Sequence, residues 1–217
     1  MDDQIEAFKA LSVAAVSDAM DRLGLHGACF GILPLGPGCR SVGRAFTVKY
    51  IPVGVEKGTV GDYIDNVAPG EVVVLDNAGR LDCTVWGDLL TSVAHKRGVA
   101  GTVVHGVCRD VARSFEIAYP IFSRGRFMRT GKDRVQVDGV NVPVSLGDVQ
   151  VCPGDILLGN DDGIVVVPKQ REGDVLSLAQ RVSEAEEKIL SEALRRMRLE
   201  DARRKYGYHE LQRRGSG

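Results

Sequence analysis

Arg109 and the start of the helix predicted near Asp88 have types and positions suited to binding a small carboxylate. Arg109 and Asp110 follow an apolar run that ends at Val107, and Asp88 stands at the start of a segment with helical spacing. In open α/β sheets, ligands bind beyond the carboxyl ends of the strands. Arg109 can offer a carboxylate two parallel donors. The first N–H groups of a helix that starts near Asp88 lack intrahelical partners, so those around Leu89 and Leu90 can meet an anion.

The neighbouring carboxylates add a possible cation site. Asp88 and Asp110 beside an arginine can bind a hard, water-rich cation such as Mg²⁺. Such a cation polarises a carbonyl and stabilises an enolate, which both a retro-aldol cleavage and a decarboxylation require. From spacing alone, Arg109–Asp110 also fits a loop salt bridge, and Asp88 also fits a simple helix N-cap.

The elements around these residues indicate a parallel α/β unit. Residues 71–76 and 101–107 have the composition of buried strands, and residues 88–97 between them have the apolar spacing of a helix. A strand–helix–strand order of this kind is typical of parallel sheets. Before this unit, the patterns predict a helix over 5–24, a Gly- and Pro-rich loop, a strand over 45–53 and a short helix over 59–67.

The second half of the chain is predicted to be mostly β, followed by a long helix. Valines alternate around Asp138-Gly139, which predicts a hairpin there. Apolar runs separated by Pro153-Gly154 and Asp161–Gly163 predict three more strands, over 148–151, 155–158 and 163–167. Residues 170–206 have a long apolar stripe, which could pack on the same subunit or on a neighbour, and residues 212–217 are expected to be frayed.

Composition excludes several classes of protein. The chain has 217 residues, of which 44% are hydrophobic and 26% are charged, and its formal net charge is −1. It therefore lacks the excess of basic residues that is typical of a protein that binds nucleic acid. No apolar run is long enough to span a membrane, and the acidic N-terminus has no apolar signal core. The five cysteines are odd in number and show no C-x-x-C spacing. These features favour reduced thiols and a cytoplasmic protein.

The segment around Arg109 resembles the central signature of the RraA-like family. That signature is an Asp, twenty intervening residues and then Arg-Asp, which Asp88 and Arg109–Asp110 match. The family includes the 4-hydroxy-4-methyl-2-oxoglutarate aldolases, which are class II pyruvate aldolases. The segments that carry the resemblance are 17–21, 86–90, 97–101, 106–110, 120–125, 153–155 and 161–168.

The resemblance implies a fold and an assembly. It implies an α/β fold of the swivelling-domain type, a three-layer β/β/α sandwich. The chain would be a single domain over 1–217, with residues 170–210 as a helical C-terminal extension. It also implies a homotrimer or homohexamer, in which a Glu from a neighbouring subunit completes the site. Glu184, Glu186 and Glu187 are candidates for that Glu.

The resemblance also implies a role for each matching residue. Arg109 would bind the carboxylate of a small 2-oxo acid, assisted by Gly87 and by the backbone N–H groups of Leu89 and Leu90. Asp110 would ligate Mg²⁺ or Mn²⁺, and Asp88 would hold metal-bound water, so that Asp88 and Arg109 act in catalysis.

Two activities follow as hypotheses. The first is a metal-dependent aldolase that cleaves a 4-hydroxy-2-oxo acid to pyruvate, with oxaloacetate decarboxylation as a side activity. The alternative is a regulator that binds a ribonuclease, as the protein for which the family is named does. Two positions depart from the family pattern: His105, where relatives often carry Asp, and the turn at residues 77–79. They affect the expected second half of the substrate more than the pyruvyl half.

Overall fold

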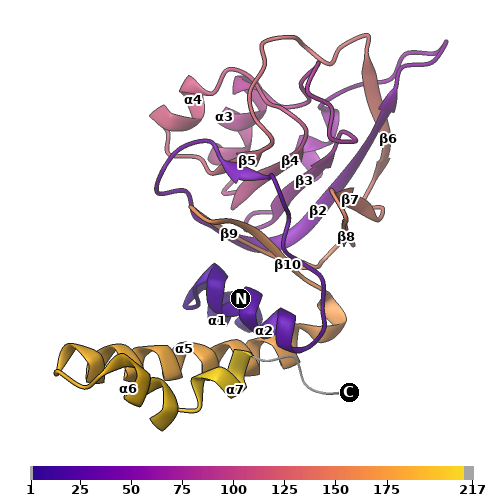
Figure 1. The fold of residues 1–217 in the computed structure, drawn as a ribbon. Helices are drawn as coiled ribbons and strands as arrows, with labels where there is room; N and C mark the ends of the chain where they lie inside the picture. Colours follow the sequence, from indigo (N-terminus) through magenta and orange to yellow (C-terminus); the bar gives the residue numbers. More distant parts are fainter. Residues whose placement is uncertain (1, 213–217) are drawn as a thin grey trace.

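The computed structural model describes residues 2–212 and contains one large mixed sheet (Figure 1). Its centre is four parallel strands in the order β5-β4-β3-β2, flanked by antiparallel strands. Along the sheet the strands are β1 (Leu33–Pro34), β5 (Ile121–Ser123), β4 (Gly101–His105), β3 (Val72–Asp76), β2 (Ser41–Pro52), β9 (Ile156–Asn160) and β10 (Gly163–Val167). The chain before β1 bonds to β10, where the Cys29 N–H donates to the Ile164 carbonyl at 3.0 Å, so the sheet nearly closes on itself.

The layers confirm the β/β/α arrangement. One face of the parallel strands packs against the 3-10 helix η1 (Asp62–Asn66) and the helices α3 (Asp88–Lys96) and α4 (Ala112–Glu116). The other face packs against the inner side of β9–β10 and against a separate two-stranded sheet, β7 (Val144–Leu146) with β8 (Val149–Val151). Both faces of the parallel strands are therefore buried, which explains their nearly continuous apolar sequences.

The terminal helices form a further layer on the outer side of β9–β10 (Figure 1). This layer contains α1 (Asp3–Lys9), α2 (Val13–Arg22) and α5 (Glu172–Leu194), the last preceded by the 3-10 helix η2 (Lys169–Arg171). The hairpin alternates between the two cores, because Ile156 and Leu158 face the helices while Leu157 faces the parallel sheet.

The single helix expected over 5–24 is wrong, because two helices occupy that range. Ser12 interrupts the helical chain with extended backbone and its hydroxyl accepts from the Ala15 N–H at 3.0 Å, which caps the start of α2. The apolar spacing continues across the break, so it could not reveal the cap. The expected helix over 59–67 is the shorter 3-10 helix η1.

The hairpin expected at Asp138-Gly139 is also wrong. Both residues lie inside β6 (Val135–Val140), a strand that pairs with the second half of β2 and shifts register beside Lys49 and Tyr50. The turn in this region is at Gly147, which has a φ of 70° and joins β7 to β8. The expected strands over 148–151, 155–158 and 163–167 correspond to β8, β9 and β10, but α4 and β5 were not predicted.

The helix expected over 170–206 is broken after Leu194. Arg196 has a φ of 79°, and the chain then forms α6 (Leu199–Lys205) and α7 (Tyr208–Gln212). The apolar stripe packs against α1 and α2 as far as Ile189, while Leu190 and Leu194 remain 60% and 77% exposed. From residue 213 on, the end expected to be frayed lies outside the described residues.

Two further findings concern the expected environment of the chain. Within residues 2–212, every helix is too short or too polar to cross a membrane. All five cysteines are free thiols, and burial raises the pKa of Cys29 to about 12 and that of Cys108 to about 11.

Candidate functional site

The start of α3 is held in place by a buried tryptophan. Trp86 is 2% exposed, and its indole N–H donates to the Thr91 hydroxyl at 2.9 Å. That hydroxyl donates in turn to the Gly87 carbonyl at 2.9 Å, which also accepts from the Thr91 N–H at 3.0 Å. These bonds fix the first turn, and no side chain caps it, because the N-cap residue is Gly87. Of the first N–H groups of α3, that of Leu89 donates to the Asp88 carboxylate and that of Leu90 remains open toward a ligand.

Arg109 reaches the start of α3 through the chain that follows β4. Its backbone N–H donates to the Trp86 carbonyl at 3.0 Å, which places the two segments side by side. Its Nε lies 3.2 Å from Asp110 Oδ2, and its side chain is 41% exposed. Within residues 2–212, the two terminal nitrogens of the guanidinium make no hydrogen bond. The outer edge of the guanidinium is thus free to bind a carboxylate with two parallel bonds.

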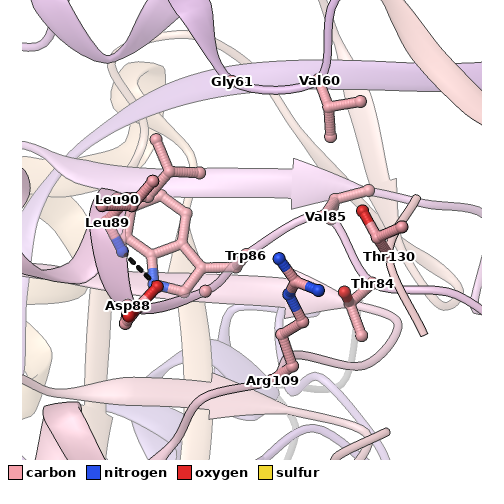
Figure 2. A pocket seen from close by; sticks show the side chains of 11 residues that line it. Val60, Gly61, Thr84, Val85, Trp86, Asp88, Leu89, Leu90, Arg109 and Thr130 are labelled. Carbon is pink, nitrogen blue, oxygen red and sulfur yellow. Dashed lines mark hydrogen bonds between the residues drawn. The ribbon is translucent and has the colours of Figure 1, made fainter. Parts of the chain in front are cut away.

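A cavity of about 180 Å³ lies between Arg109 and the start of α3 (Figure 2). Figure 2 shows the guanidinium between the first turn of α3 on one side and Thr84 and Thr130 on the other. A cavity of this size suits a small ligand. The lining residues are Val60, Gly61, Thr84, Val85, Trp86, Gly87, Asp88, Leu89, Leu90, Arg109 and Thr130.

Asp110 stands beside this cavity rather than in its lining. It has a φ of 54°, in the left-handed region that a non-glycine residue rarely occupies. Together with Arg109 it lines a neighbouring depression of about 270 Å³, whose other walls are Val111, Arg126, Phe127 and Met128. A Cβ on Gly87 would lie 2.9 Å from Asp110 Oδ2, so glycine at this position lets the carboxylate approach the start of α3.

The carboxylates fit one kind of metal ion better than others. Within residues 2–212, no group of three or more His, Cys, Asp or Glu side chains is placed to hold a metal. A zinc site closed by protein ligands normally needs at least three such side chains. Mg²⁺ and similar ions keep several waters and use one or two carboxylates. The Asp110 carboxylate lies close to Gly87, directly before Asp88 at the start of α3, and these two carboxylates fit an ion of that second kind.

The structure brings together five of the six residues expected from the sequence. Gly87, Asp88, Leu89, Leu90 and Arg109 line one cavity, and Asp110 contacts Arg109 from outside it. The Asp88 carboxylate accepts from the Leu89 N–H at 2.8 Å, so the Leu90 N–H is the more available donor of the two.

Sequence reasoning missed the remaining walls of the cavity. Val60 and Gly61 come from the segment before η1, and Thr130 comes from the long loop after β5. Thr84 pairs with both Val107 and Thr130 through isolated bridges. Trp86, the single tryptophan of the chain, was the available signal, because a large buried side chain directly precedes the Gly-Asp of the motif.

His105 belongs to a different part of the sheet edge. It lies on the face covered by β7–β8, and its Nδ1 is 3.2 Å from Asp76 Oδ1. Asp76 also accepts from the N–H groups of Ala78 and Ser145, at 2.9 and 3.0 Å. Burial raises the pKa of Asp76, but the hydrogen bonds from His105 and the two N–H groups outweigh burial, so its pKa is lowered.

The three glutamates proposed for a neighbouring subunit lie on α5. Glu184 is exposed, and Glu186 accepts from the Tyr208 hydroxyl at 2.9 Å. The helix is in the terminal layer, with β9–β10 between it and the parallel sheet (Figure 1). A role for these residues therefore remains a prediction about another copy of the chain.

Curated relatives cover most of the chain. A protein of Halalkalibacterium halodurans, provisionally named as a 4-hydroxy-4-methyl-2-oxoglutarate aldolase, is 35% identical over 195 residues, which are 88% of this chain and 90% of that protein. Protein DlpA of Legionella pneumophila is 39% identical over 201 residues, which are 91% of this chain. The matched region is 32% of DlpA, so the chain spans about a third of that relative's length.

Solved structures and a family model agree with these relatives. An uncharacterized protein from Pseudomonas syringae pv. tomato superimposes with a TM-score of 0.88 at 41% identity, covering 94% of this chain and 98% of that one. RraAS2 of Streptomyces coelicolor, described as an unusual member of the RNase ES inhibitor RraA family, has a TM-score of 0.77 at 27% identity, covering 86% and 96%. The family model RraA-like, described as Aldolase/RraA, matches residues 13–166. The chain therefore belongs to the RraA-like family.

Proposed function

We propose that the protein is a divalent-metal-dependent aldolase. It cleaves a 4-hydroxy-2-oxo acid, of the 4-hydroxy-4-methyl-2-oxoglutarate type, to pyruvate and a second carbonyl compound, and it decarboxylates oxaloacetate as a side activity. The observation that carries this proposal is the free outer edge of the Arg109 guanidinium facing the uncapped start of α3 across a small cavity. Membership of a family with relatives named as aldolases supports it.

The two sides of the cavity bind the 2-oxo acid end of the substrate. Arg109 takes the carboxylate through its terminal nitrogens, and the Leu90 N–H together with the positive end of α3 supports the same anion. Asp110, held beside Arg109, would hold Mg²⁺ or Mn²⁺ with its remaining sites filled by water. When bound, the ion supplies a positive charge that stabilises the oxygen of the enolate.

In the cleavage, the proton and the electron pair released by the substrate are both accounted for. The proton of the 4-hydroxyl passes through bound water to the Asp88 carboxylate, and the bond between C3 and C4 breaks. The electron pair of that bond forms the enolate of pyruvate, and C4 becomes the carbonyl of the second product. The enolate then takes a proton at C3. With oxaloacetate, carbon dioxide leaves instead and the same enolate results.

A second candidate function is suggested by the comparison with RraAS2. Its description as a member of an RNase inhibitor family favours a regulator that binds a ribonuclease and has no catalytic role. Such a regulator does not require Asp88, Arg109 and Asp110 together at one cavity, and for that reason we favour the aldolase.

The experiment is pyruvate release from oxaloacetate and from 4-hydroxy-4-methyl-2-oxoglutarate, with Mg²⁺ and then with EDTA. We expect release from both that EDTA abolishes and Mg²⁺ restores. Asp110→Asn should remove the metal-dependent turnover, because a neutral amide is a poor ligand for a hard cation. Asp148→Asn is the matched control, since Asp148 is 70% exposed on the β7–β8 turn and pairs with His26.

Two results would contradict the proposal. One is an Asp110→Asn variant that turns over both compounds and still responds to the metal. The other is a wild-type protein that releases no pyruvate from either compound while retaining a ribonuclease partner in a pull-down, which would favour the regulator.

A further inference from the structure

One polar side chain of the cavity has no partner in the protein. Thr84 is 3% exposed, it lines the cavity, and its hydroxyl makes no hydrogen bond with residues 2–212. Among the described residues, the buried side-chain oxygens without a partner are Gln4 Oε1 and Ser41 Oγ, so the Thr84 hydroxyl oxygen is accessible from the cavity. Its hydrogen-bonding capacity is therefore available to a ligand that enters the cavity.

The surroundings of Thr84 fix its backbone and leave its hydroxyl free to rotate. Its N–H donates to the Arg129 carbonyl at 2.9 Å, and it bridges to Val107 and to Thr130 on either side. A Cβ on Gly131 would lie 2.5 Å from the Thr84 carbonyl oxygen, so the neighbouring segment packs closely against this backbone. The hydroxyl therefore stands at a defined position on a rigid support, as a binding group requires.

The position of Thr84 indicates which part of the substrate it meets. Figure 2 shows Thr84 on the side of Arg109 that faces away from the first turn of α3. If the carboxylate lies between Arg109 and α3, as the proposed function requires, the chain of the substrate extends toward Thr84, Val85 and Thr130. Among these three, Val85 is apolar and the Thr130 hydroxyl already accepts from the Lys132 N–H at 3.2 Å.

We propose that the Thr84 hydroxyl binds the oxygen on C4 of the aldol substrate and so distinguishes the substrate from pyruvate. A freely rotating hydroxyl can donate to the oxygen on C4 in the intact substrate and keep donating to it as it becomes a carbonyl, while the proton of the 4-hydroxyl leaves through water toward Asp88. Thr84 would thus be a substrate-contacting residue for the half of the molecule that Arg109 does not bind. This inference rests on the proposed function for the orientation of the substrate.

The test compares a ligand that has the C4 oxygen with one that lacks it. Trp86 is the single tryptophan and lines the cavity, so its fluorescence can report binding of either ligand. For Thr84→Val we expect the affinity for 4-hydroxy-4-methyl-2-oxoglutarate and its kcat/KM to fall about tenfold, the loss of one hydrogen bond, while the affinity for pyruvate stays unchanged. Thr84→Ser should restore the wild-type values.

Ser41→Ala is the matched control. Ser41 is also 3% exposed and its hydroxyl also lacks a partner, but that hydroxyl packs against Gly101, where a Cβ would lie 2.5 Å away. Removing it should change neither affinity. Thermal unfolding of all three variants checks that each is folded, and we expect Thr84→Val to be at least as stable as the wild type.

The outcomes separate this inference from the proposed function. Equal loss of affinity for both ligands, or no loss for either, overturns the role of Thr84. If the wild type binds both ligands but releases no pyruvate, the aldolase proposal fails, while the ratio of the two affinities in Thr84→Val still decides the role of Thr84. If the wild type binds neither ligand, both proposals are wrong.

Discussion

Both faces of the parallel sheet carry polar groups at the carboxyl edge of the strands. On one face these groups are hydrogen-bonded within the protein, and on the other they are not. On the face covered by β7–β8, Asp76 accepts three hydrogen bonds, from His105, Ala78 and Ser145. On the face covered by α3, the terminal nitrogens of Arg109 and the hydroxyl of Thr84 have no partner within residues 2–212. The first set is mostly buried and satisfied within the protein, which contributes to stability, whereas the second set is accessible from the cavity and is available to a ligand.

This comparison corrects a simple interpretation of charged residues at a sheet edge. Asp76 and His105 have residue types typical of catalytic sites, and His105 departs from the family pattern. Yet the hydrogen bonds of Asp76 tie β3 to β4 and to β7, and neither side chain lines the cavity. Residue types that are common in catalytic sites indicate a site only when their polar atoms are not already hydrogen-bonded within the protein.

The largest expected effect is a loss of turnover on substitution of Arg109, on the face covered by α3. Arg109→Lys keeps the charge but loses the two parallel donors, so we expect kcat/KM for pyruvate release to fall roughly 10²-fold or more, equivalent to about 2.7 kcal/mol or more. Thermal unfolding should be nearly unchanged, because the guanidinium makes one exposed ion pair. Steady-state kinetics check the first expectation. Unchanged kinetics would mean that Arg109 is structural and would remove the contrast between the two faces.

The next largest effect should appear on the face covered by β7–β8, and there we expect a loss of stability rather than of turnover. Asp76→Asn leaves one acceptor oxygen where the carboxylate has two, so the Ser145 N–H loses its partner. We expect the free energy of unfolding to fall by about 2 kcal/mol and the Tm by about 4–8 °C. The kcat/KM for pyruvate release should stay within about twofold of the wild type. A large loss of turnover with unchanged Tm would place Asp76 in the active site instead.

The smallest effect is the pH dependence of the same group. The folded pKa of Asp76 lies below its usual value of 3.8, so its charged form stabilises the fold above that pH and the stabilisation is lost as the pH falls through the folded pKa. Between pH 7 and pH 5 this group should not alter stability. Below about pH 4, urea unfolding should show a shallower loss for Asp76→Asn than for the wild type. Parallel curves for the two proteins would contradict this assignment.

The parts of the fold and the site that could be predicted from the sequence are those with a regular local pattern. The strand–helix–strand unit around α3 was predicted because its apolar runs are bounded by clear stops, and the Asp88, Arg109 and Asp110 positions followed from it. Asp138-Gly139 was predicted as a turn from its residue types, but pairing with the long strand β2 keeps it extended. Tertiary pairing overrides a local turn preference when a partner strand is present.

The missed parts of the site have a different cause. Thr84, Val60 and Thr130 come from three segments that no local pattern connects, and they meet only because the chain after β5 returns to pair beside residue 84. Nothing in the sequence indicates that the Thr84 hydroxyl lacks a partner, because that depends on every neighbour in space.

The hairpin β9–β10 belongs to two cores at once, and this has a consequence for how the molecule opens. Ile156, Leu158 and Val165 would be exposed to water if the terminal helices detached, while Leu157 and Val166 hold the same strands to the parallel sheet. We expect the backbone amides of this hairpin to be among the slowest to exchange with deuterium. Protein lacking α5 should lose the slow exchange of β3 and β4 as well, because the hairpin couples the two cores into one cooperative unit.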